Sequence, residues 1–288
     1  REGPPRAGLL VSAQGISNMI ILDRANPLRN PDCPTILQDE DKTIVVYDLE
    51  FLTNLAKHAD YERNDGSAAC KEPRWPFAEI VCASWVVIRF PAGAGRQPEV
   101  GRFHSLRRPE MDEIDIADHF FRQVLERETD GNGDPARLVS WAGDWKDNEV
   151  LRRVAMTWGI TAPPQLRSTD PRCPLRLDLC QDTRIGPKKS VHLSEYAQAQ
   201  GLPGKLFPAR GVGEYAETGN WKTVENQCVH DVLLTAILAC RRLSTLGEIG
   251  QTGKACTRAL IDRYCERGPS DSTRMWSRWR KENLGYRG

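Results

Sequence analysis

The sequence predicts an α/β domain in which helices flank a mixed β-sheet. Short apolar runs typical of strands come first, and segments with helical periodicity then alternate with further strands. The chain of 288 residues is 40% hydrophobic, which provides enough apolar side chains for one substantial core. No internal repeat is present, and no apolar stretch reaches the length of a membrane span. A single domain that does not enter the membrane is therefore expected.

The first part of the domain is predicted to be a β-hairpin followed by a helix. The apolar run Ile44–Tyr47 and the longer run Ala78–Phe90 have the composition of buried strands. A glycine-rich turn then leads into a third strand over residues 99–106. Apolar residues repeat with helical spacing over residues 114–128, which predicts a helix with one buried side.

The second part alternates strands and helices and ends in a polar tail. Strands are predicted over residues 137–141 and 175–180 and helices over 147–158, 192–200, 223–243 and 254–265, with a glycine- and proline-rich loop over 202–220. The tail contains the basic, tryptophan-containing sequence RMWSRWRK. We predict three regions: an extension over residues 1–41, the α/β domain over 42–266 and the basic tail over 267–288.

Composition limits the cellular context only broadly. Forty Lys and Arg residues against 39 Asp and Glu residues give a net charge of +1, so attraction to a polyanion must come from local patches. The nine cysteines form no CxxC pair, which favours reduced thiols and a cytoplasmic protein over a disulfide framework or a zinc site. Because the chain opens at Arg1 rather than Met, we expect further sequence upstream.

Two carboxylates follow the first apolar run on one face of the strand. Strand side chains alternate, so Asp48 and Glu50 share a face with Ile44 and Val46. Carboxylates on a packed face need a cation as partner. The pair therefore predicts the start of a divalent-metal site.

Two further carboxylates are predicted to point inward from helices. At 100° per residue, Asp147 lies on the apolar stripe of its helix, and Asp231 lies on that of the long helix 223–243. Asp144 is placed where a helix N-cap is expected. For Asp178 a surface or turn-stabilising role is favoured over a catalytic one. Asp48, Glu50, Asp147 and Asp231 thus form a four-carboxylate set that could converge on two cations.

Several segments, taken in order, resemble the DEDD superfamily of 3′-to-5′ exonucleases, which have the ribonuclease H-like fold. The likeness is greatest to the predicted exonucleases related to the proofreading domain of family B DNA polymerases. It runs from about Lys42 to Leu246, through VVYDLEF, PFAEIVCASWV, LVSWAGDWKDNEVLRRVAMTWGI, LRLDLCQD, HLSEYAQAQGLPGK and QCVHDVLLTAILACRRL. Asp48 and Glu50 occupy the positions of the first motif, Asp147 that of the second and Asp231 that of the third.

The resemblance implies a two-metal nuclease that acts on the 3′ end of a nucleic acid, most simply single-stranded DNA, in a process such as DNA repair. Asp48, Glu50, Asp147 and Asp231 are then expected to hold two Mg²⁺ or Mn²⁺ ions. The family's general base, a Tyr or His shortly before the last Asp, is replaced here by Gln227 and Asn226. Gln227 could position the water, and His230 is a second candidate, although it is rotated about 100° from Asp231 on the helix.

Residues expected to contact the nucleic acid are aromatic or basic: Phe51, Trp145, Arg278 and Arg280. The alternative for the RMWSRWRK segment is a solvated helix face with two packing tryptophans. The alternative for the whole protein is a nucleic-acid-binding scaffold that keeps the exonuclease fold but has lost its base. A third possibility is a purely structural, ion-paired domain.

Overall fold

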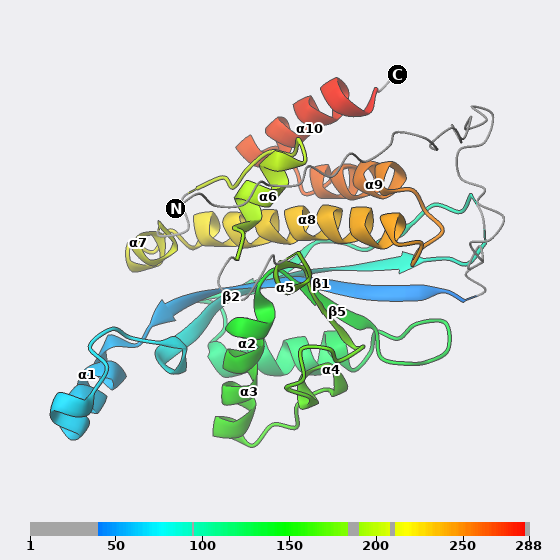
Figure 1. The fold of residues 1–288 in the computed structure, drawn as a ribbon. Helices are drawn as coiled ribbons and strands as arrows, with labels where there is room; N and C mark the ends of the chain where they lie inside the picture. Colours follow the sequence, from blue (N-terminus) through cyan, green and yellow to red (C-terminus); the bar gives the residue numbers. More distant parts are fainter. Residues whose placement is uncertain (1–39, 94, 184–189, 208–210, 286–288) are drawn as a thin grey trace, which may run out of the picture. The chain divides into compact units, whose positions relative to one another are not determined.

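A six-stranded mixed sheet forms the centre of the fold in the computed structural model, which describes residues 40–93, 95–183, 190–207 and 211–285 (Figure 1). The strand order is β3-β2-β1-β5-β6, with β4 paired to β2. The strands are β1 Lys42–Thr53, β2 Ala78–Phe90, β3 Glu99–Val100, β4 His104–Arg107, β5 Arg137–Ser140 and β6 Arg176–Asp178. The predicted α/β fold with a mixed sheet is confirmed. Almost all of the predicted extension lies outside the described residues.

Strand β1 is central because it pairs on both sides. It is antiparallel to β2 over its whole length and parallel to β5, which in turn is parallel to β6. The strand continues to Thr53, past the apolar run that predicted it, because its polar end still pairs with β2. The register shifts between Glu50 and Phe51, immediately after the two carboxylates.

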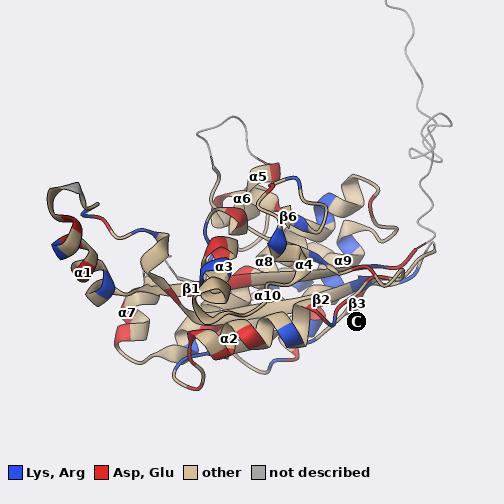
Figure 2. Ribbon diagram, turned by 90° about the horizontal axis from the view of Figure 1, so that it is seen from below, with Lys and Arg blue, Asp and Glu red and all other residues tan. Residues whose placement is uncertain are grey.

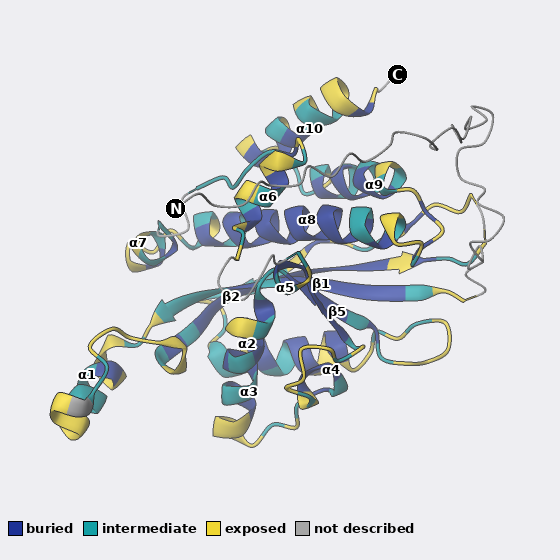
Figure 3. Ribbon diagram, in the orientation of Figure 1, coloured by how far each residue is buried: buried dark blue, intermediate teal, exposed yellow. Residues whose placement is uncertain are grey.

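Helices cover both faces of the sheet (Figures 1 and 3). Helix α8 packs along one face and is backed by α9 and α10, while α2, the π-helix η3 and α3 pack on the other. In Figure 3 the middle of α8 and much of β1 and β2 are buried. The helices of eight or more residues are α1 Leu55–Asp65, α3 Asp147–Trp158, α8 Trp221–Thr245, α9 Gly253–Cys265 and α10 Asp271–Leu284. The shorter ones are α2 Glu113–His119, η3 Phe120–Leu125, α4 Pro164–Arg167, α5 Leu179–Asp182, α6 Leu193–Ala199 and α7 Gly211–Glu217, with 3₁₀ turns η1 Gly66–Ala68, η2 Trp75–Phe77 and η4 Gly143–Trp145.

The alternation of β1 side chains divides the core into two layers. Ile44 and Val46 pack with α8, whereas Val45 and Tyr47 pack with α2, η3 and α3. The face shared by Asp48 and Glu50 is therefore the face covered by α8. This alternation places the end of β1 against the helix that carries Asp231.

Three helices occupy segments for which the sequence predicts loop or tail. Helix α1 is capped by the Asn54 side chain, which accepts a hydrogen bond from the Lys57 amide. Helix α7 lies inside the predicted loop 202–220, and α10 lies inside the predicted tail. A capping box at Ser270 begins α10, and the fully buried Trp276 anchors it. The division of the chain into an extension over residues 1–41, a domain over 42–266 and a tail over 267–288 stays a prediction.

Charges of both signs are interspersed over the ribbon, in keeping with the net charge near zero (Figure 2). Among the described residues, no helix combines the length and the apolar character that crossing a membrane requires.

Candidate active site

Three carboxylates meet where the end of β1 passes under α8. Asp48, Glu50 and Asp231 each offer an oxygen, and these oxygens lie within 4.8 Å of one another. Asp231 is 2% exposed, and the other two side chains are half-buried. Like charges at this separation repel each other unless a cation lies between them. Oxygen donors from carboxylates are the ligands that Mg²⁺ and Mn²⁺ prefer, so the donor set fits a divalent cation.

Burial and repulsion between neighbouring carboxylates raise the pKa values of Asp48 and Glu50. Burial, followed by repulsion from Asp231, raises the pKa of Asp48 from its ordinary value of 3.8 to about 7. Burial also raises the pKa of Glu50, and the charges of Asp48 and Asp231 add to the effect. The folded chain therefore holds these carboxylates at a free-energy cost that a bound cation would relieve.

Lys205, from the segment that follows α6, supplies a positive charge to the cluster. Its Nζ atom forms an ion pair with Oδ2 of Asp231. Burial lowers the pKa of Lys205, but attraction to Asp231 and Asp48 outweighs burial and raises it. The ammonium group is therefore protonated and acts as an internal counter-ion.

Gln227 lies one helical turn before Asp231 and contacts its other oxygen. The Gln227 Nε2 atom donates to Asp231 Oδ1 at 3.0 Å, and Gln227 Oε1 accepts from the Phe207 amide at 3.2 Å. The side chain is 2% exposed. Gln227 thus fixes Asp231 and connects α8 to the segment that carries Lys205.

His230 is buried away from water and both of its ring nitrogens are engaged. Trp276 Nε1 donates to Nδ1 at 3.3 Å, so the proton lies on Nε2, which is 3.0 Å from the Gly204 carbonyl oxygen. Burial lowers the pKa of His230, which favours the neutral ring. With Nδ1 occupied by an N–H donor, His230 has no free lone pair with which to remove a proton from water.

Asp147 approaches the cluster but is not one of the three grouped residues. It is 8% exposed at the first position of α3, so its predicted inward orientation is confirmed. Burial raises its pKa, and the charge of Asp48 is the next largest cause. The first residue of α3 therefore lies close enough to Asp48 for the two carboxylates to repel each other.

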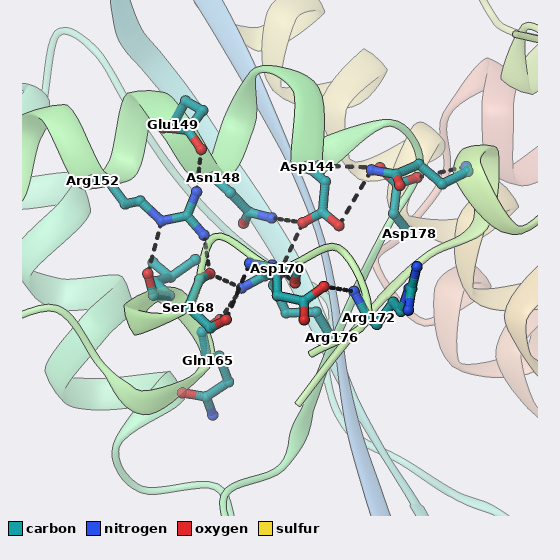
Figure 4. Close-up of polar contacts among 12 residues, drawn as sticks. Asp144, Asn148, Glu149, Arg152, Gln165, Ser168, Asp170, Arg172, Arg176 and Asp178 are labelled. Atoms are coloured by element: carbon teal, nitrogen blue, oxygen red, sulfur yellow. Dashed lines mark hydrogen bonds and ion pairs between the residues drawn. The ribbon is translucent and has the colours of Figure 1, made fainter. Parts of the chain in front are cut away.

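Asp178 holds the turn that joins β5 to α3 (Figure 4). Its carboxylate accepts hydrogen bonds from the amides of Ala142, at 2.8 Å, and Asp144, at 3.1 Å. It also caps α5 through the amide of Cys180, at 2.9 Å. Ala142 has a φ of 64°, a left-handed conformation that is costly for a residue with a β-carbon. The turn-stabilising interpretation of Asp178 fits this placement, and the carboxylate is buried rather than at the surface.

Asp144 is not an N-cap, contrary to the sequence-based expectation. Lys146 occupies the N-cap position of α3 and its side chain forms no capping hydrogen bond. Instead, Asp144 Oδ1 accepts from Arg176 Nε at 2.9 Å and from Asn148 Nδ2 at 2.6 Å (Figure 4). Asn148 in turn accepts from the Tyr47 hydroxyl at 2.6 Å. Asp144 therefore connects β6, α3 and β1. This buried network fixes the start of α3, where Asp147 lies.

A pocket of about 710 Å³ opens beside the carboxylates. Asp48, Asp231 and Lys205 line it together with the aromatic residues Trp141 and Phe207. Lys205 offers this concave site a positive charge and the aromatic rings offer stacking surfaces, whereas the two carboxylates need a cation beside them before an anionic ligand can approach.

The residues predicted to contact nucleic acid lie in two separate places. Phe51 packs against the core layer of α2, η3 and α3, and Lys146 Nζ lies 4.0 Å from the centre of its ring, whereas Trp145 is 48% exposed in the turn before α3. Arg278 and Arg280 lie on α10. Arg278 lines a groove of about 690 Å³ between α9 and α10, whereas Arg280 forms an ion pair with Asp262. In the alternative interpretation of the RMWSRWRK segment, its two tryptophans pack against the domain, and Trp276 fits this role because it is fully buried.

Sequence reasoning did not identify Lys205. Its segment has neither helical nor strand periodicity, and a lysine in a loop usually faces solvent. The available signal was the loop itself, since long loops in compact domains are commonly functional.

Comparison with known proteins relates the chain to one family. The model of a family described as a predicted 3′-5′ exonuclease related to the exonuclease domain of PolB matches residues 73–282. The match begins after β1, so Asp48 and Glu50 lie outside it, whereas Asp147, Lys205 and Asp231 lie inside. No curated protein matches the chain in a sequence search.

Among solved structures, the family B DNA polymerase of the hyperthermophilic archaeon Pyrobaculum calidifontis is similar, with a TM-score of 0.46 and 16% sequence identity. The similarity covers 78% of this chain and 29% of the polymerase. The family model, by contrast, spans well over half of the chain. The chain belongs to the family of predicted 3′-5′ exonucleases related to the exonuclease domain of PolB.

Proposed function

We propose that the protein is a metal-dependent 3′-to-5′ exonuclease that hydrolyses phosphodiester bonds at the 3′ end of a nucleic acid strand, with single-stranded DNA as the preferred substrate. The observation that carries the proposal is the convergence of Asp48, Glu50 and Asp231 beside a pocket that Asp48 and Asp231 line. Membership of a predicted exonuclease family supports the same function.

Asp48, Glu50 and Asp231 would hold the metal, with Asp147 as a fourth ligand for a second ion. Two bound Mg²⁺ or Mn²⁺ ions would lower the pKa of the attacking water and stabilise the departing 3′ oxygen. The chain contributes the rigid placement of these carboxylates: Gln227 fixes Asp231, and the Asp144 and Asp178 contacts fix the start of α3. Burial of the cluster would strengthen the attraction between the bound cations and the phosphate.

The roles of Gln227 and His230 follow from their hydrogen bonds. Gln227 is bonded to Asp231, so it positions a ligand rather than removing a proton. His230 is occupied by Trp276 and faces the Gly204 carbonyl. A general base typically contributes about 10²- to 10⁴-fold in rate. We therefore propose a slow enzyme in which water is activated without a protein base.

The nucleic acid would contact two regions. Around the start of α3, Phe51 and Trp145 are the aromatic candidates for stacking on bases, and Lys146 already lies over one face of the Phe51 ring. Farther away, Arg278 offers a positive charge to the phosphate backbone: its side chain is 82% exposed, and its ion pair with the exposed Glu282 is long, at 3.6 Å. Arg280 is a weaker candidate because Asp262 already neutralises it.

Because neither Gln227 nor His230 is available as a base, a second candidate function is a nucleic-acid-binding protein that keeps the fold with little or no hydrolysis. The two functions differ in their response to metal. A working site predicts that Mn²⁺ raises the melting temperature and that Asp48→Asn abolishes this effect. A binding protein predicts no response to metal and retained affinity for an oligonucleotide.

The activity is tested with a single strand labelled at its 5′ end, incubated with Mg²⁺ or Mn²⁺. We expect a ladder that shortens from the 3′ end and is blocked by phosphorothioate linkages at that end. The matched control is Asp48→Asn, which preserves the shape of the side chain and removes its charge. A wild-type protein that yields no more product than this control would contradict the proposed activity.

A further inference from the structure

Lys205 occupies the position in the carboxylate cluster that the proposed function assigns to a cation. Both oxygens of Asp231 are already bound by this chain, Oδ2 by Lys205 and Oδ1 by Gln227. Lys205 also lines the pocket that opens beside Asp48 and Asp231. We propose that Lys205 is an exchangeable counter-ion, which neutralises the cluster without metal and, once a divalent cation displaces it, binds a phosphate of the nucleic acid. This inference rests on the proposed function.

The position of Lys205 is determined by its neighbours in the chain. The Gly204 carbonyl accepts from His230 at 3.0 Å, and the Lys205 amide donates to Ser194 Oγ at 3.3 Å. Two residues later, the Phe207 amide donates to Gln227. These contacts fix the backbone on α6 and α8, so only the flexible side chain has to move when Asp231 is released.

Gly204 allows this close approach of the segment to α6. A β-carbon at this position would lie 2.8 Å from Ser194 Oγ and would displace the end of the Gln198 side chain. The site that presents Lys205 is therefore built by close packing.

Charge explains why the exchange is favourable. Three neighbouring carboxylates carry a formal charge of −3 when ionised, and a single ammonium group leaves most of it uncompensated. A divalent cation neutralises more of this charge, and it then repels the ammonium group at short range. The side chain is 26% exposed and its pocket is open to a ligand. An ammonium group released into that pocket next to the carboxylates is placed to bind an anionic phosphate.

The alternative is a permanent ion pair that only stabilises the fold. The two roles differ in how Lys205 affects binding: an exchangeable counter-ion competes with metal and contributes to nucleic-acid affinity only when metal is present. A permanent pair does neither.

The experiment compares full-length wild-type protein with Lys205→Met, which keeps the length of the side chain without its charge. Lys222→Met is the matched control, because Lys222 is on α8 and pairs with Glu225 at the surface. Titration calorimetry with Mn²⁺ alone measures the first effect. We expect Lys205→Met to bind Mn²⁺ about tenfold more tightly than wild type, a change of the size that competition between two cations for one site produces. Lys222→Met should bind Mn²⁺ with the same affinity as wild type.

Fluorescence anisotropy measures the second effect, with a single strand protected by phosphorothioate linkages. With saturating Mn²⁺ we expect Lys205→Met to bind the strand about tenfold more weakly than wild type. In EDTA the two proteins should bind it equally. Lys205→Gln, which retains a donor for Asp231, provides a second comparison if the methionine variant does not fold.

The outcomes separate this inference from the proposed function. Equal Mn²⁺ affinity in wild type and Lys205→Met would overturn the exchange, and so would an equal loss of strand affinity with and without Mn²⁺. If neither protein bound Mn²⁺, the metal-dependent exonuclease itself would be refuted, and the inference with it.

Discussion

Replacing Asp48 with Asn should stabilise the metal-free protein at alkaline pH. The half-buried carboxyl group lies beside Asp231, and partial burial together with the charge of Asp231 raises its pKa to about 7. Because this value is higher than in the unfolded chain, the folded chain binds more protons between the two values. Raising the pH through this interval therefore lowers the free energy of unfolding of the wild type.

The magnitude follows from the two pKa values. The interval from 3.8 to about 7 corresponds to about 4 kcal/mol, at about 1.36 kcal/mol for each pH unit. The whole penalty is present above pH 7 and absent below pH 3.8. Since Asn resembles the protonated carboxyl group, Asp48→Asn should match the wild type at low pH and be more stable by up to about 4 kcal/mol at high pH.

Urea unfolding at a series of pH values in EDTA measures the difference, because EDTA removes any cation that would compensate the cluster. Glu79→Gln is a control of opposite sign. Burial raises the pKa of Glu79, but a hydrogen bond from Asn54 and the charge of Arg108 outweigh it, so the pKa is lowered. That variant should lose stability relative to the wild type as the pH rises above the range in which Glu79 titrates. Parallel pH profiles for the wild type and Asp48→Asn would refute the reasoning about the cluster.

Three further predictions concern the support of the site and the second basic region. Asp178→Ala should lower the free energy of unfolding, measured with urea, by roughly 3 kcal/mol, because several backbone amides lose the buried carboxylate that accepts their hydrogen bonds. The control Asp182→Ala removes a partly exposed ion pair and should lower the free energy of unfolding by less than about 1 kcal/mol. Gly143→Ala should reduce the melting temperature because a β-carbon there overlaps the side chain at the end of β5, whereas Gly213→Ala, with nothing within 4 Å, should not; equal effects would contradict the close packing. Arg278→Gln should weaken oligonucleotide binding and flatten its dependence on salt, and an unchanged slope would exclude a phosphate contact at that residue.

The sequence predicted the sheet and the inward carboxylates because both depend on local periodicity. Alternation along β1 placed Asp48 and Glu50 on one face, and helical spacing placed Asp147 and Asp231 on inner faces. The helices α7 and α10 were not predicted because tertiary packing, such as that of Trp276, stabilises segments whose periodicity is weak.

The supporting contacts depend on residues far apart in the sequence. Asp144 was expected to be a cap because it lies just before α3, but its side chain pairs with Arg176, which belongs to strand β6. Lys205 forms an ion pair with Asp231, which is far from it in the sequence, and no local sequence pattern predicts that the two residues meet. The face of a helix or strand on which a residue lies can thus be predicted from the sequence. The residue with which it pairs depends on how the helices and strands pack together.

The most direct test of the central claim is anomalous diffraction from crystals of the protein soaked with Mn²⁺. We expect an anomalous peak bounded by the carboxylates of Asp48, Glu50 and Asp231, with the Lys205 ammonium group moved away from Asp231. A peak elsewhere, or none at these carboxylates at saturating Mn²⁺, would contradict it.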